Sequence, residues 1–489
     1  MLMTIRFILN DRDVTRDRFS PSETLLDYLR IERRLTGSKE GCAEGDCGAC
    51  TVLVGRLTRG RLVYETVNAC IRFTASLNAT HVVTVEHLAA KDGKLHPVQQ
   101  AMVDMNGSQC GFCTPGFVMS LYALWMENEK PSRQAIEKAL QGNLCRCTGY
   151  EPIVKAAEKA SAIRPDAAFD ALARERETIL AKLAAMKTGE TITVGNESKR
   201  GIIPGSAEAL AEVLAEYRDA TIVAGSTDVG LWVTKQMRDL NPMVFINHLE
   251  ELQTITETEK SFIIGAGVTY TEAFPALAGK IPALSRLIDR IGGEQVRNMG
   301  TIGGNVANGS PIGDTPPALI ALGATLTLQS KDGTRSIALE DFFRDYGKQD
   351  KRPGEFVLSL TVPKPAKGAH YAVYKVSKRR EEDISALCGA FYLELARDGT
   401  VDKIRIAYGG MAGIPKRAAH VEAALSGKPW TSETVEAVRP AFESDYQPMT
   451  DMRATAEYRM LAAKNLLSRL LLETGGSPQE LSRFEREEA

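Results

Sequence analysis

Residues 42–50 read Cys-Ala-Glu-Gly-Asp-Cys-Gly-Ala-Cys, which places three cysteines close together, and Cys70 follows after a strand-length interval. Gly45 and Gly48 let the backbone turn tightly, because glycine alone enters positive φ without steric cost. A tight loop of this kind also points successive backbone N–H groups at a central anion. The cysteine spacing, four residues and then two, is typical of a plant-type [2Fe–2S] centre. The ligands that we expect for this centre are Cys42, Cys47, Cys50 and Cys70.

Two other interpretations of these cysteines are weaker. A structural zinc site usually combines two short cysteine pairs of similar spacing, whereas here the first gap is long and Cys70 stands alone. A disulfide framework needs an oxidising compartment, and the short N-terminal apolar run, which carries Arg6, does not resemble a secretory signal. The sequence therefore favours an iron–sulfur centre.

Length and composition set broad limits on the protein. A chain of 489 residues is long enough for several domains with separate cores. The net charge of −2 gives no electrostatic basis for binding nucleic acid or an anionic membrane. No window approaches the roughly 20 apolar residues that a membrane span needs, so we expect a soluble, cytoplasmic protein.

The N-terminal elements fit a small mixed sheet. Residues 4–9 are predicted to form a strand, and residues 51–54 another. Between them, Ser20 is predicted to cap a helix, with Pro21 at its first position and Glu23 completing a capping box. This order is expected of a ferredoxin-like β-grasp fold.

A second set of cysteines follows in a helical region. Residues 109–116 read QCGFCTPG and residues 143–149 read NLCRCTG, and helices are predicted over 98–105, 117–125 and 133–140. Two loops with two cysteines each can meet at the ends of packed helices. Spacing of the C-x-C type constrains a zinc tetrahedron awkwardly, so this pattern also favours an iron–sulfur centre.

The remainder of the chain alternates strands and helices. Residues 165–195 are rich in Ala, Glu, Lys and Arg and are predicted to form an exposed linker. A loop at 224–228 (AGSTD) follows a predicted strand, and a second Gly-rich loop lies at 300–305 (GTIGGN); both can hold a pyrophosphate through backbone N–H groups, although such loops are more often ordinary turns. No G-x-G-x-x-G opens a helix after a strand, so a Rossmann fold is not supported.

The stretches CAEGDCGAC, QCGFCTPG and NLCRCTGY, in this order, resemble the iron–sulfur half of the xanthine dehydrogenase family of molybdenum hydroxylases. The resemblance implies a multidomain α+β chain. Its predicted parts are a β-grasp [2Fe–2S] domain (1–88), a helical [2Fe–2S] domain (89–164), the linker (165–195), a PCMH-type FAD-binding domain (196–368) and a C-terminal α+β flavoprotein domain (369–489). It also implies a second ligand set, which consists of Cys110, Cys113, Cys145 and Cys147.

The stretches AGSTDVG and TIGGNVANGSPIGD resemble the two flavin-binding segments of the same family. The resemblance implies that the first wall of the FAD site consists of Ile222, Val223, Ala224, Gly225, Ser226, Thr227, Asp228 and Val229. The remaining FAD residues that it implies are Ile291, Thr301, Ile302, Gly303, Gly304, Asn305, Asp314, Val357 and Lys375.

The function implied by the resemblance is electron transfer. Electrons from a molybdenum–pterin centre on a large partner subunit would pass through two [2Fe–2S] clusters to FAD and then to NAD, as xanthine or hypoxanthine is oxidised. Gln109 and Cys147 would face the pterin, and no catalytic residue is expected on this chain. The family also implies an assembly of two small and two large subunits.

Two other functions compete with this one. An equivalent subunit could serve a partner that oxidises an aldehyde or an N-heterocycle. A non-enzymatic iron–sulfur redox sensor is the alternative from another class, and it would need exposed low-pKa cysteines and a recognition surface, which the sequence does not offer.

Overall fold

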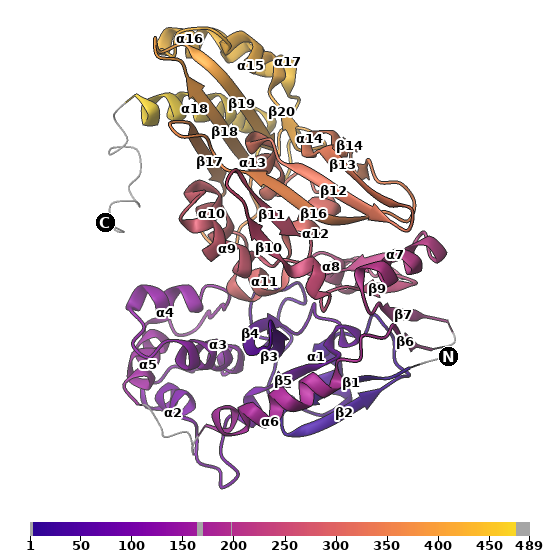
Figure 1. The fold of residues 1–489 in the computed structure, drawn as a ribbon. Helices are drawn as coiled ribbons and strands as arrows, with labels where there is room; N and C mark the ends of the chain where they lie inside the picture. Colours follow the sequence, from indigo (N-terminus) through magenta and orange to yellow (C-terminus); the bar gives the residue numbers. More distant parts are fainter. Residues whose placement is uncertain (1–2, 164–169, 197, 476–489) are drawn as a thin grey trace. The chain divides into compact units, whose positions relative to one another are not determined.

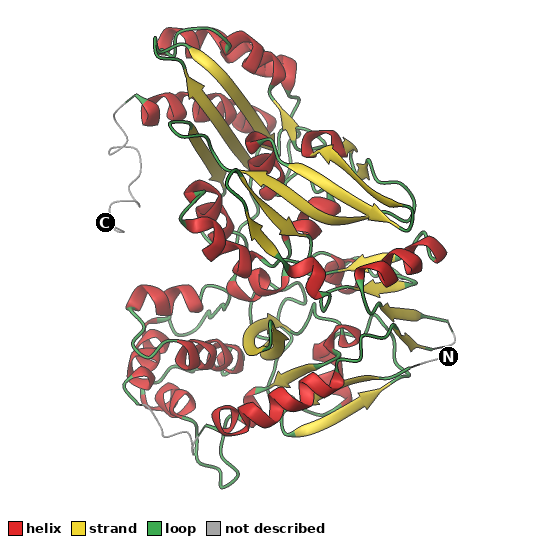
Figure 2. Cartoon of the chain, in the orientation of Figure 1, coloured by secondary structure: helices red, strands yellow, loops and turns green. Residues whose placement is uncertain are grey.

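A computed structural model describes residues 3–163, 170–196 and 198–475 of the chain. Figure 1 follows the chain by residue number, and Figure 2 shows its helices and strands. The chain divides into two compact units. Unit 1 consists of Met1–Glu251 and Gly292–Thr301, and unit 2 consists of Leu252–Ile291 and Ile302–Ala489. Residues 292–301 therefore fold with unit 1, although both of their flanks in the sequence belong to unit 2.

The N-terminal part of unit 1 contains a mixed five-stranded sheet in the order β2-β1-β5-β3-β4. Its strands are β1 (Ile5–Leu9), β2 (Arg12–Arg16), β3 (Thr51–Thr58), β4 (Arg61–Asn68) and β5 (Thr80–Val83). Strand β1 pairs antiparallel with β2 and parallel with β5, while β3 pairs antiparallel with both β4 and β5. This topology confirms the predicted β-grasp fold.

The helix of this sheet begins later than predicted. Helix α1 (Leu25–Asp27) continues directly into a π-helical turn, η1 (Tyr28–Glu32). The prediction that Ser20 caps the helix is wrong, because Thr24 is the N-cap and its Oγ1 accepts from the Asp27 N–H at 3.1 Å. Glu23 instead forms an ion pair with Arg16, so it does not complete a capping box.

The helical part of unit 1 agrees with the predicted helices to within a few residues. Its helices are α2 (Pro97–Asp104), α3 (Thr114–Glu127), α4 (Arg133–Ala139), α5 (Glu151–Ser161) and α6 (Ala171–Met186). Helix α3 is buried along most of its length, and α5 contributes a face of small and branched apolar residues to the same core.

Helix α6 corrects the expectation that residues 165–195 are exposed; residues 164–169 lie outside the described part of the chain. Leu172, Ile179 and Leu183 of α6 are almost completely buried in the core of unit 1. These residues recur at intervals that place them on one face of a helix. Their number is small among many charged residues, which is why composition alone suggested a solvated linker.

A second sheet completes unit 1. Its order is β6-β7-β9-β8, formed by β6 (Ile192–Gly195), β7 (Arg200–Ile203), β8 (Thr221–Val223) and β9 (Met243–Phe245). The pairs of β9 with β7 and with β8 are parallel. The helices of this part are α7 (Ala207–Glu216), α8 (Val229–Thr234) and α11 (Glu294–Met299). Unit 1 also contains the 3-10 turns η2 (Thr74–Leu77) and η3 (Val85–His87), and its first segment ends within a third such turn, η4 (Glu250–Gln253).

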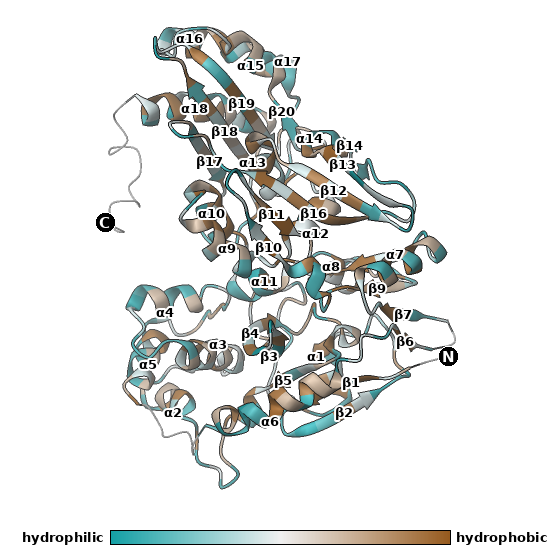
Figure 3. Cartoon of the chain, viewed as in Figure 1, coloured by the Kyte–Doolittle hydropathy of each residue, from teal (hydrophilic) through white to brown (hydrophobic). Residues whose placement is uncertain are grey.

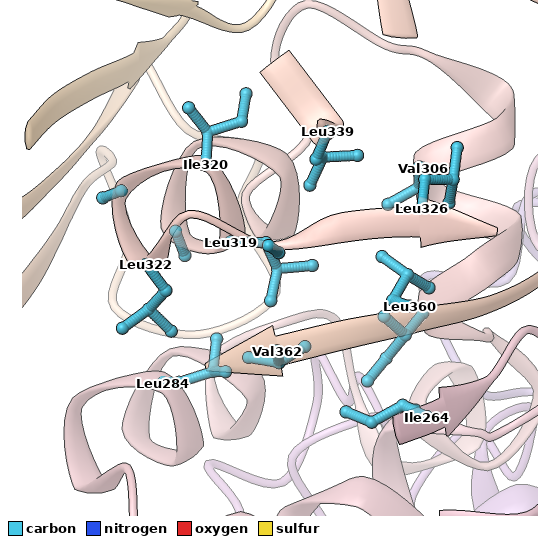
Figure 4. Packing of buried hydrophobic residues seen from close by; sticks show 14 of the residues in the cluster. Ile264, Leu284, Val306, Leu319, Ile320, Leu322, Leu326, Leu339, Leu360 and Val362 are labelled. Carbon is cyan, nitrogen blue, oxygen red and sulfur yellow. The ribbon is translucent and has the colours of Figure 1, made fainter. Parts of the chain in front are cut away.

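Unit 2 contains a five-stranded sheet in the order β10-β11-β16-β12-β13. Its strands are β10 (Ile255–Glu257), β11 (Ser261–Gly265), β12 (Thr325–Ser330), β13 (Gly333–Ala338) and β16 (Phe356–Pro363). Its helices are α9 (Tyr270–Ala278), α10 (Pro282–Asp289), α12 (Ile302–Asn308), α13 (Thr315–Leu322) and α14 (Leu339–Phe342). Figure 4 shows Leu319 of α13 beside Val362 of β16, and Leu322 of α13 beside Leu284 of α10, in the hydrophobic core.

The C-terminal part of unit 2 is a four-stranded antiparallel sheet in the order β17-β18-β19-β20. Its strands are β17 (His370–Val376), β18 (Leu387–Leu395), β19 (Val401–Gly409) and β20 (Lys416–Arg417), and a two-stranded pair is formed by β14 (Phe343–Asp345) and β15 (Lys348–Gln349). The helices are α15 (Ala419–Leu425), α16 (Ser432–Val438), α17 (Phe442–Asp445) and α18 (Ala456–Thr474), with the 3-10 turn η5 (Arg439–Ala441). Strand β18 is hydrophobic along most of its length (Figure 3), and β19 adds Ile404, Ile406 and Tyr408 to the same hydrophobic core.

Candidate functional site

The first cysteine loop wraps around the thiol of Cys42. Three residues of the loop, Ala43, Gly45 and Gly48, have positive φ angles of 54°, 80° and 67°. The backbone N–H groups of Glu44, Asp46 and Cys47 all point at Cys42 Sγ, at 3.5, 3.4 and 3.4 Å. Such a concave set of N–H donors stabilises negative charge on sulfur.

The other thiols of the first set lie against Cys42. Cys42 hydrogen-bonds with Cys47 and with Cys70, and Cys70 hydrogen-bonds with Cys50. The hydrogen bond from Cys47 is the main cause that lowers the pKa of Cys42 below its ordinary value. Gly41 leaves no room for a side chain here, because a Cβ at this position would be 2.8 Å from Cys47 Sγ. The structure therefore brings the first predicted set of four together.

The second set of thiols gathers from two loops. Cys110 Sγ and Cys147 Sγ are 3.6 Å apart, and Cys113 hydrogen-bonds with Cys145. Cys113 is the residue before α3 and Cys145 is buried, whereas Cys110 and Cys147 are exposed. Cys145 is held in place because its N–H donates to Tyr150 Oη at 3.0 Å. Gln109, next to Cys110, is also exposed.

The arrangement of these thiols suits a two-iron cluster. Among residues 3–163, 170–196 and 198–475, no group of three or more His, Cys, Asp or Glu side chains is arranged so that it could hold a metal ion. The thiols lie in two pairs in the second set and in a chain of contacts in the first, and four cysteines in each set supply the all-thiolate ligation that a cluster of two irons uses. The sequence-predicted ligand sets therefore fit a [2Fe–2S] group in their donor chemistry.

The first predicted flavin segment lies in unit 1. Ile222 and Val223 end strand β8, the loop 224–228 follows, and Val229 begins α8. A Cβ at Gly225 would lie 1.7 Å from the carbonyl oxygen of Met299, so only glycine fits. Ser226 has a φ of 58°, and burial raises the pKa of Asp228. The loop is thus compact and turns sharply, as a phosphate-binding loop must.

The second predicted segment opens helix α12 in unit 2. Gly303 packs against Ala266, where a Cβ would come within 2.4 Å of Ala266 Cα. Ile302, Gly304 and Asn305 share this first turn of α12, whereas Thr301 belongs to unit 1. Asn305 Oδ1 accepts a short hydrogen bond from the Thr315 hydroxyl.

Asp314 and Lys375 are brought together in unit 2. The Lys375 ammonium donates to Asp314 Oδ2 at 2.7 Å, and also to the Arg290 carbonyl oxygen at 3.2 Å. Ser385 Oγ donates to the other carboxylate oxygen at 2.5 Å. Ile291 is partly buried against the core of unit 2 and Val357 lies within it, which agrees with a packing role for Val357.

Sequence reasoning missed several polar residues of these sites. Ser385 and Arg290, which support Asp314 and Lys375, belong to no motif. Asn143, two residues before Cys145, and Gln295, far away in the sequence, form a buried network beside both cysteine loops. A lone amide side chain gives no signal in a sequence, so only the fold reveals them.

The described residues contain no helix long and apolar enough to cross a membrane.

Three family models match the chain. Residues 84–158 match a [2Fe–2S] binding domain, residues 197–365 match the FAD binding domain in molybdopterin dehydrogenase, and residues 372–474 match the CO dehydrogenase flavoprotein C-terminal domain. These domains confirm the predicted multidomain α+β architecture.

Curated relatives are similar along most of the chain. Xanthine dehydrogenase of Emericella nidulans is 34% identical over 91% of this chain, and xanthine dehydrogenase of Drosophila subobscura is 33% identical over 88%. Aldehyde oxidase 1 of Bos taurus is 31% identical over 88%. The chain spans about a third of the length of these relatives, since the matches cover 36% of each.

Solved structures match about half of the chain. Cyanide-inactivated Cu,Mo-CO dehydrogenase has a TM-score of 0.52 at 27% identity, and the match covers 55% of this chain and 94% of that one. Quinoline 2-oxidoreductase from Pseudomonas putida 86 has a TM-score of 0.52 at 25% identity, covering 56% and 96%. Together with the matched domains, these similarities place the chain in the molybdenum hydroxylase family, as a carrier of its iron–sulfur and FAD-binding domains.

Proposed function

We propose that this chain is the electron-transfer subunit of a molybdenum hydroxylase. The observation that supports it most is the presence of two sets of four neighbouring thiols in unit 1 on the same chain as a FAD binding domain. When bound, the clusters supply one-electron carriers, and the flavin supplies a group that exchanges electrons singly or in pairs. The domain boundaries given from the sequence are part of this proposal.

The proposed ligands of the first cluster are Cys42, Cys47, Cys50 and Cys70, and those of the second are Cys110, Cys113, Cys145 and Cys147. The residues of this chain hold each cluster in a defined environment. Backbone N–H groups of Glu44, Asp46 and Cys47 stabilise charge on the Cys42 sulfur, and burial of Cys50 and Cys70 excludes water from that side.

The proposed FAD residues are the loop 222–229 in unit 1 and the start of α12 with Asp314 and Lys375 in unit 2. The sharp turn at Ser226 and the close approach of Gly225 suit backbone contacts to a diphosphate. Lys375 is held by Asp314 and the Arg290 carbonyl, so its position is fixed before any ligand binds. We propose NAD as the final acceptor.

We propose a large partner subunit that carries the molybdenum–pterin centre, in an assembly of two copies of each chain in the cytoplasm. The exposure of Cys110, Cys147 and the neighbouring Gln109 supports a partner at this face, because a cluster used for transfer between chains needs one accessible side. The proposal includes no nucleic acid and no membrane partner.

We propose xanthine and hypoxanthine as the substrates of the complex, because xanthine dehydrogenases are similar over about nine-tenths of the chain. A partner that oxidises an aldehyde or an N-heterocycle is the second candidate. It is supported by aldehyde oxidase 1 of Bos taurus and by quinoline 2-oxidoreductase, which are similar to a comparable degree.

The test is to purify the tagged chain with its co-purifying partner and add substrate without oxygen. Bleaching of the visible iron–sulfur and flavin absorbance by xanthine, reversed by NAD, is expected. Bleaching by dithionite and by an aldehyde or N-heterocycle, but not by xanthine, would support the second candidate. A complex that contains no iron or flavin would contradict the electron-transfer function itself.

A further inference from the structure

A buried amide connects both cysteine loops in unit 1. Gln295 of α11 is 1% exposed, and its Nε2 lies 3.2 Å from Thr51 Oγ1, 3.3 Å from Ser120 Oγ and 3.1 Å from Asn143 Oδ1. The three acceptors are themselves buried and come from three separate elements. One side chain therefore joins β3, α3 and the loop after α4.

The hydrogen bonds that the Ser120 and Thr51 hydroxyl groups donate elsewhere determine which way the Gln295 amide faces. The Ser120 hydroxyl donates to Asn143 Oδ1 at 2.7 Å, and the Thr51 hydroxyl donates to the Gly48 carbonyl at 2.7 Å. Both hydroxyl protons are thus in use, and each oxygen presents only lone pairs to Gln295. The Gln295 nitrogen, as a donor, must face them, and Oε1 lies buried without a hydrogen-bond partner in the described part of the chain.

Each acceptor is connected along the chain to a proposed ligand. Thr51 follows Cys50, Asn143 precedes Cys145 by two residues, and Ser120 lies on α3, which begins directly after Cys113. The network therefore reaches the first cysteine loop from one side and both loops of the second set from the other.

The two cysteine loops touch through their backbones at the same place. The Leu144 N–H donates to the Cys47 carbonyl at 3.0 Å, and Asn143 Nδ2 donates to the Gly48 carbonyl at 3.2 Å. A Cβ at Gly48 would lie 2.1 Å from the Gly142 carbonyl oxygen, and one at Gly116 would lie 2.1 Å from the Gly48 carbonyl oxygen. Glycine at both positions permits this approach.

Helix α11 reaches this junction from the middle of the FAD-binding domain. Its residues lie within 197–365 but fold with unit 1. Two further side chains fix the helix there: Asn298 donates to the Thr66 carbonyl of β4 at 2.9 Å, and Arg297 donates to Gln141 Oε1 at 3.0 Å. Gln295 is therefore presented to the cysteine loops by a helix that has its own anchors.

We propose that Gln295 is a positioning residue that fixes the separation of the first cysteine loop from the loops of the second set, and thereby of the two clusters. The inference rests on the proposed function, because it takes both thiol sets as cluster ligands. A buried polar network of this kind selects one arrangement of the elements that it joins, whereas an apolar side chain would let them slide.

The test compares Gln295→Ala, Gln295→Met and Gly142→Ala with Asn298→Ala in the full chain. Gly142→Ala acts on the same side chain, because its Cβ would come within 1.8 Å of Gln295 Oε1 and force the amide out of place. Asn298→Ala is the matched control, since it removes buried hydrogen bonds from the same helix to β4 rather than to the cysteine loops. Gln295→Met keeps the volume of the side chain and remains informative where the alanine variant does not accumulate.

The measurement is low-temperature electron paramagnetic resonance of the dithionite-reduced chain, with iron content and melting temperature recorded for each variant. The magnetic interaction between two reduced clusters falls steeply with their separation. We expect the wild type to show a splitting from this interaction, and Gln295→Ala, Gln295→Met and Gly142→Ala to retain iron but to broaden or lose it. Asn298→Ala should lower the melting temperature and keep the splitting.

Wild-type splitting in the Gln295 and Gly142 variants, at full iron content, would overturn the positioning role. A change of the same size in Asn298→Ala would also overturn it, because any loosening of α11 would then suffice. A wild-type chain that binds no iron contradicts the proposed function and, with it, this inference, so the two failures are distinguishable by the iron content of the unmutated protein.

Discussion

The ammonium of Lys375 lies 2.7 Å from the carboxylate of Asp314, and the two side chains are only 4% and 8% exposed. These residues are 61 positions apart in the sequence, yet they form a buried ion pair in unit 2. Ser385 and the Arg290 carbonyl complete the hydrogen bonding around the pair. A buried pair of this kind depends on both partners, because either charge alone is costly in a low-dielectric interior.

Lys375→Met should destabilise unit 2 by about 3–5 kcal/mol, because it leaves the buried Asp314 carboxylate without its counter-charge. Denaturant unfolding of the single variant and of Lys375→Met/Asp314→Asn measures the effect, and the double variant should recover part of the loss. The control is Lys348→Met, which removes an ion pair with Asp345 whose side chains are 74% and 67% exposed, and should cost less than about 1 kcal/mol. Equal losses of unfolding free energy in Lys348→Met and Lys375→Met would show that burial of the ion pair does not determine its contribution to stability.

Gly225→Ala should abolish retention of FAD after desalting. Its Cβ would meet the Met299 carbonyl oxygen at 1.7 Å, and a backbone atom cannot rotate out of the way. The loop 224–228 must therefore shift. Gly279→Ala is the matched control: nothing lies within 4 Å of its added Cβ, and its φ of −81° suits any residue. The measurement is the flavin absorbance of the purified variants. A Gly225→Ala protein with normal FAD content would exclude this loop from the proposed FAD site.

Cys147→Ser should lower the iron content of the purified chain to about half, because a [2Fe–2S] cluster needs all four thiolates and the first set remains intact. Cys388→Ser serves as the control. Cys388 is buried in β18, and its Sγ lies 3.8 Å from the Asp314 carbonyl oxygen. Iron and sulfide analysis per chain measures the result. Full iron in Cys147→Ser would exclude Cys147 as a ligand.

Stability of unit 1 should fall as the pH is lowered from about 6.5 to about 4, and part of this loss comes from His81. Burial lowers the pKa of His81 to about 4, so in this window the unfolded chain binds a proton that the folded chain does not. The ring is fully buried between Tyr64 Oη and the Asn10 carbonyl, each at 2.8 Å.

The measurement for His81 is the slope of unfolding free energy against pH in wild type and His81→Gln. As the pH falls from about 6.5 to about 4, the unfolding free energy of the wild type should decrease by up to about 3 kcal/mol more than that of the variant. His370→Gln, at an exposed position on β17, should reproduce the wild-type slope. A His81→Gln slope identical to wild type would place the acid sensitivity in other groups.

The parts of the site that the sequence predicts are those with local patterns. Cysteine spacing predicted the first thiol set, the family resemblance implied the second, and the apolar run at 117–125 predicted the body of α3. The first helix was misplaced because Ser20 and Thr24 are both competent caps, and the ion pair of Glu23 with Arg16, formed across the fold, favours the later start. Local propensity alone does not distinguish two caps that lie four residues apart.

The polar junction at Gln295 shows why the rest of the site was not predictable. Its three acceptors are 244, 175 and 152 residues away in the sequence, so no window contains the interaction. A single glutamine in a short helix has the composition of an ordinary surface residue. Its role depends on α11 being placed in unit 1, which follows from tertiary packing rather than from any periodicity.

The insertion of residues 292–301 into unit 1 also determines how the polypeptide can be divided. The chain changes unit at 251/252, at 291/292 and again at 301/302. A fragment that ends at residue 251 would lack Gln295, Asn298 and the buried Met299, and so would expose their partners. Unit 1 is thus a body assembled from two pieces of chain, and a peptide that spans α11, supplied separately, should rebind such a truncated fragment by complementation.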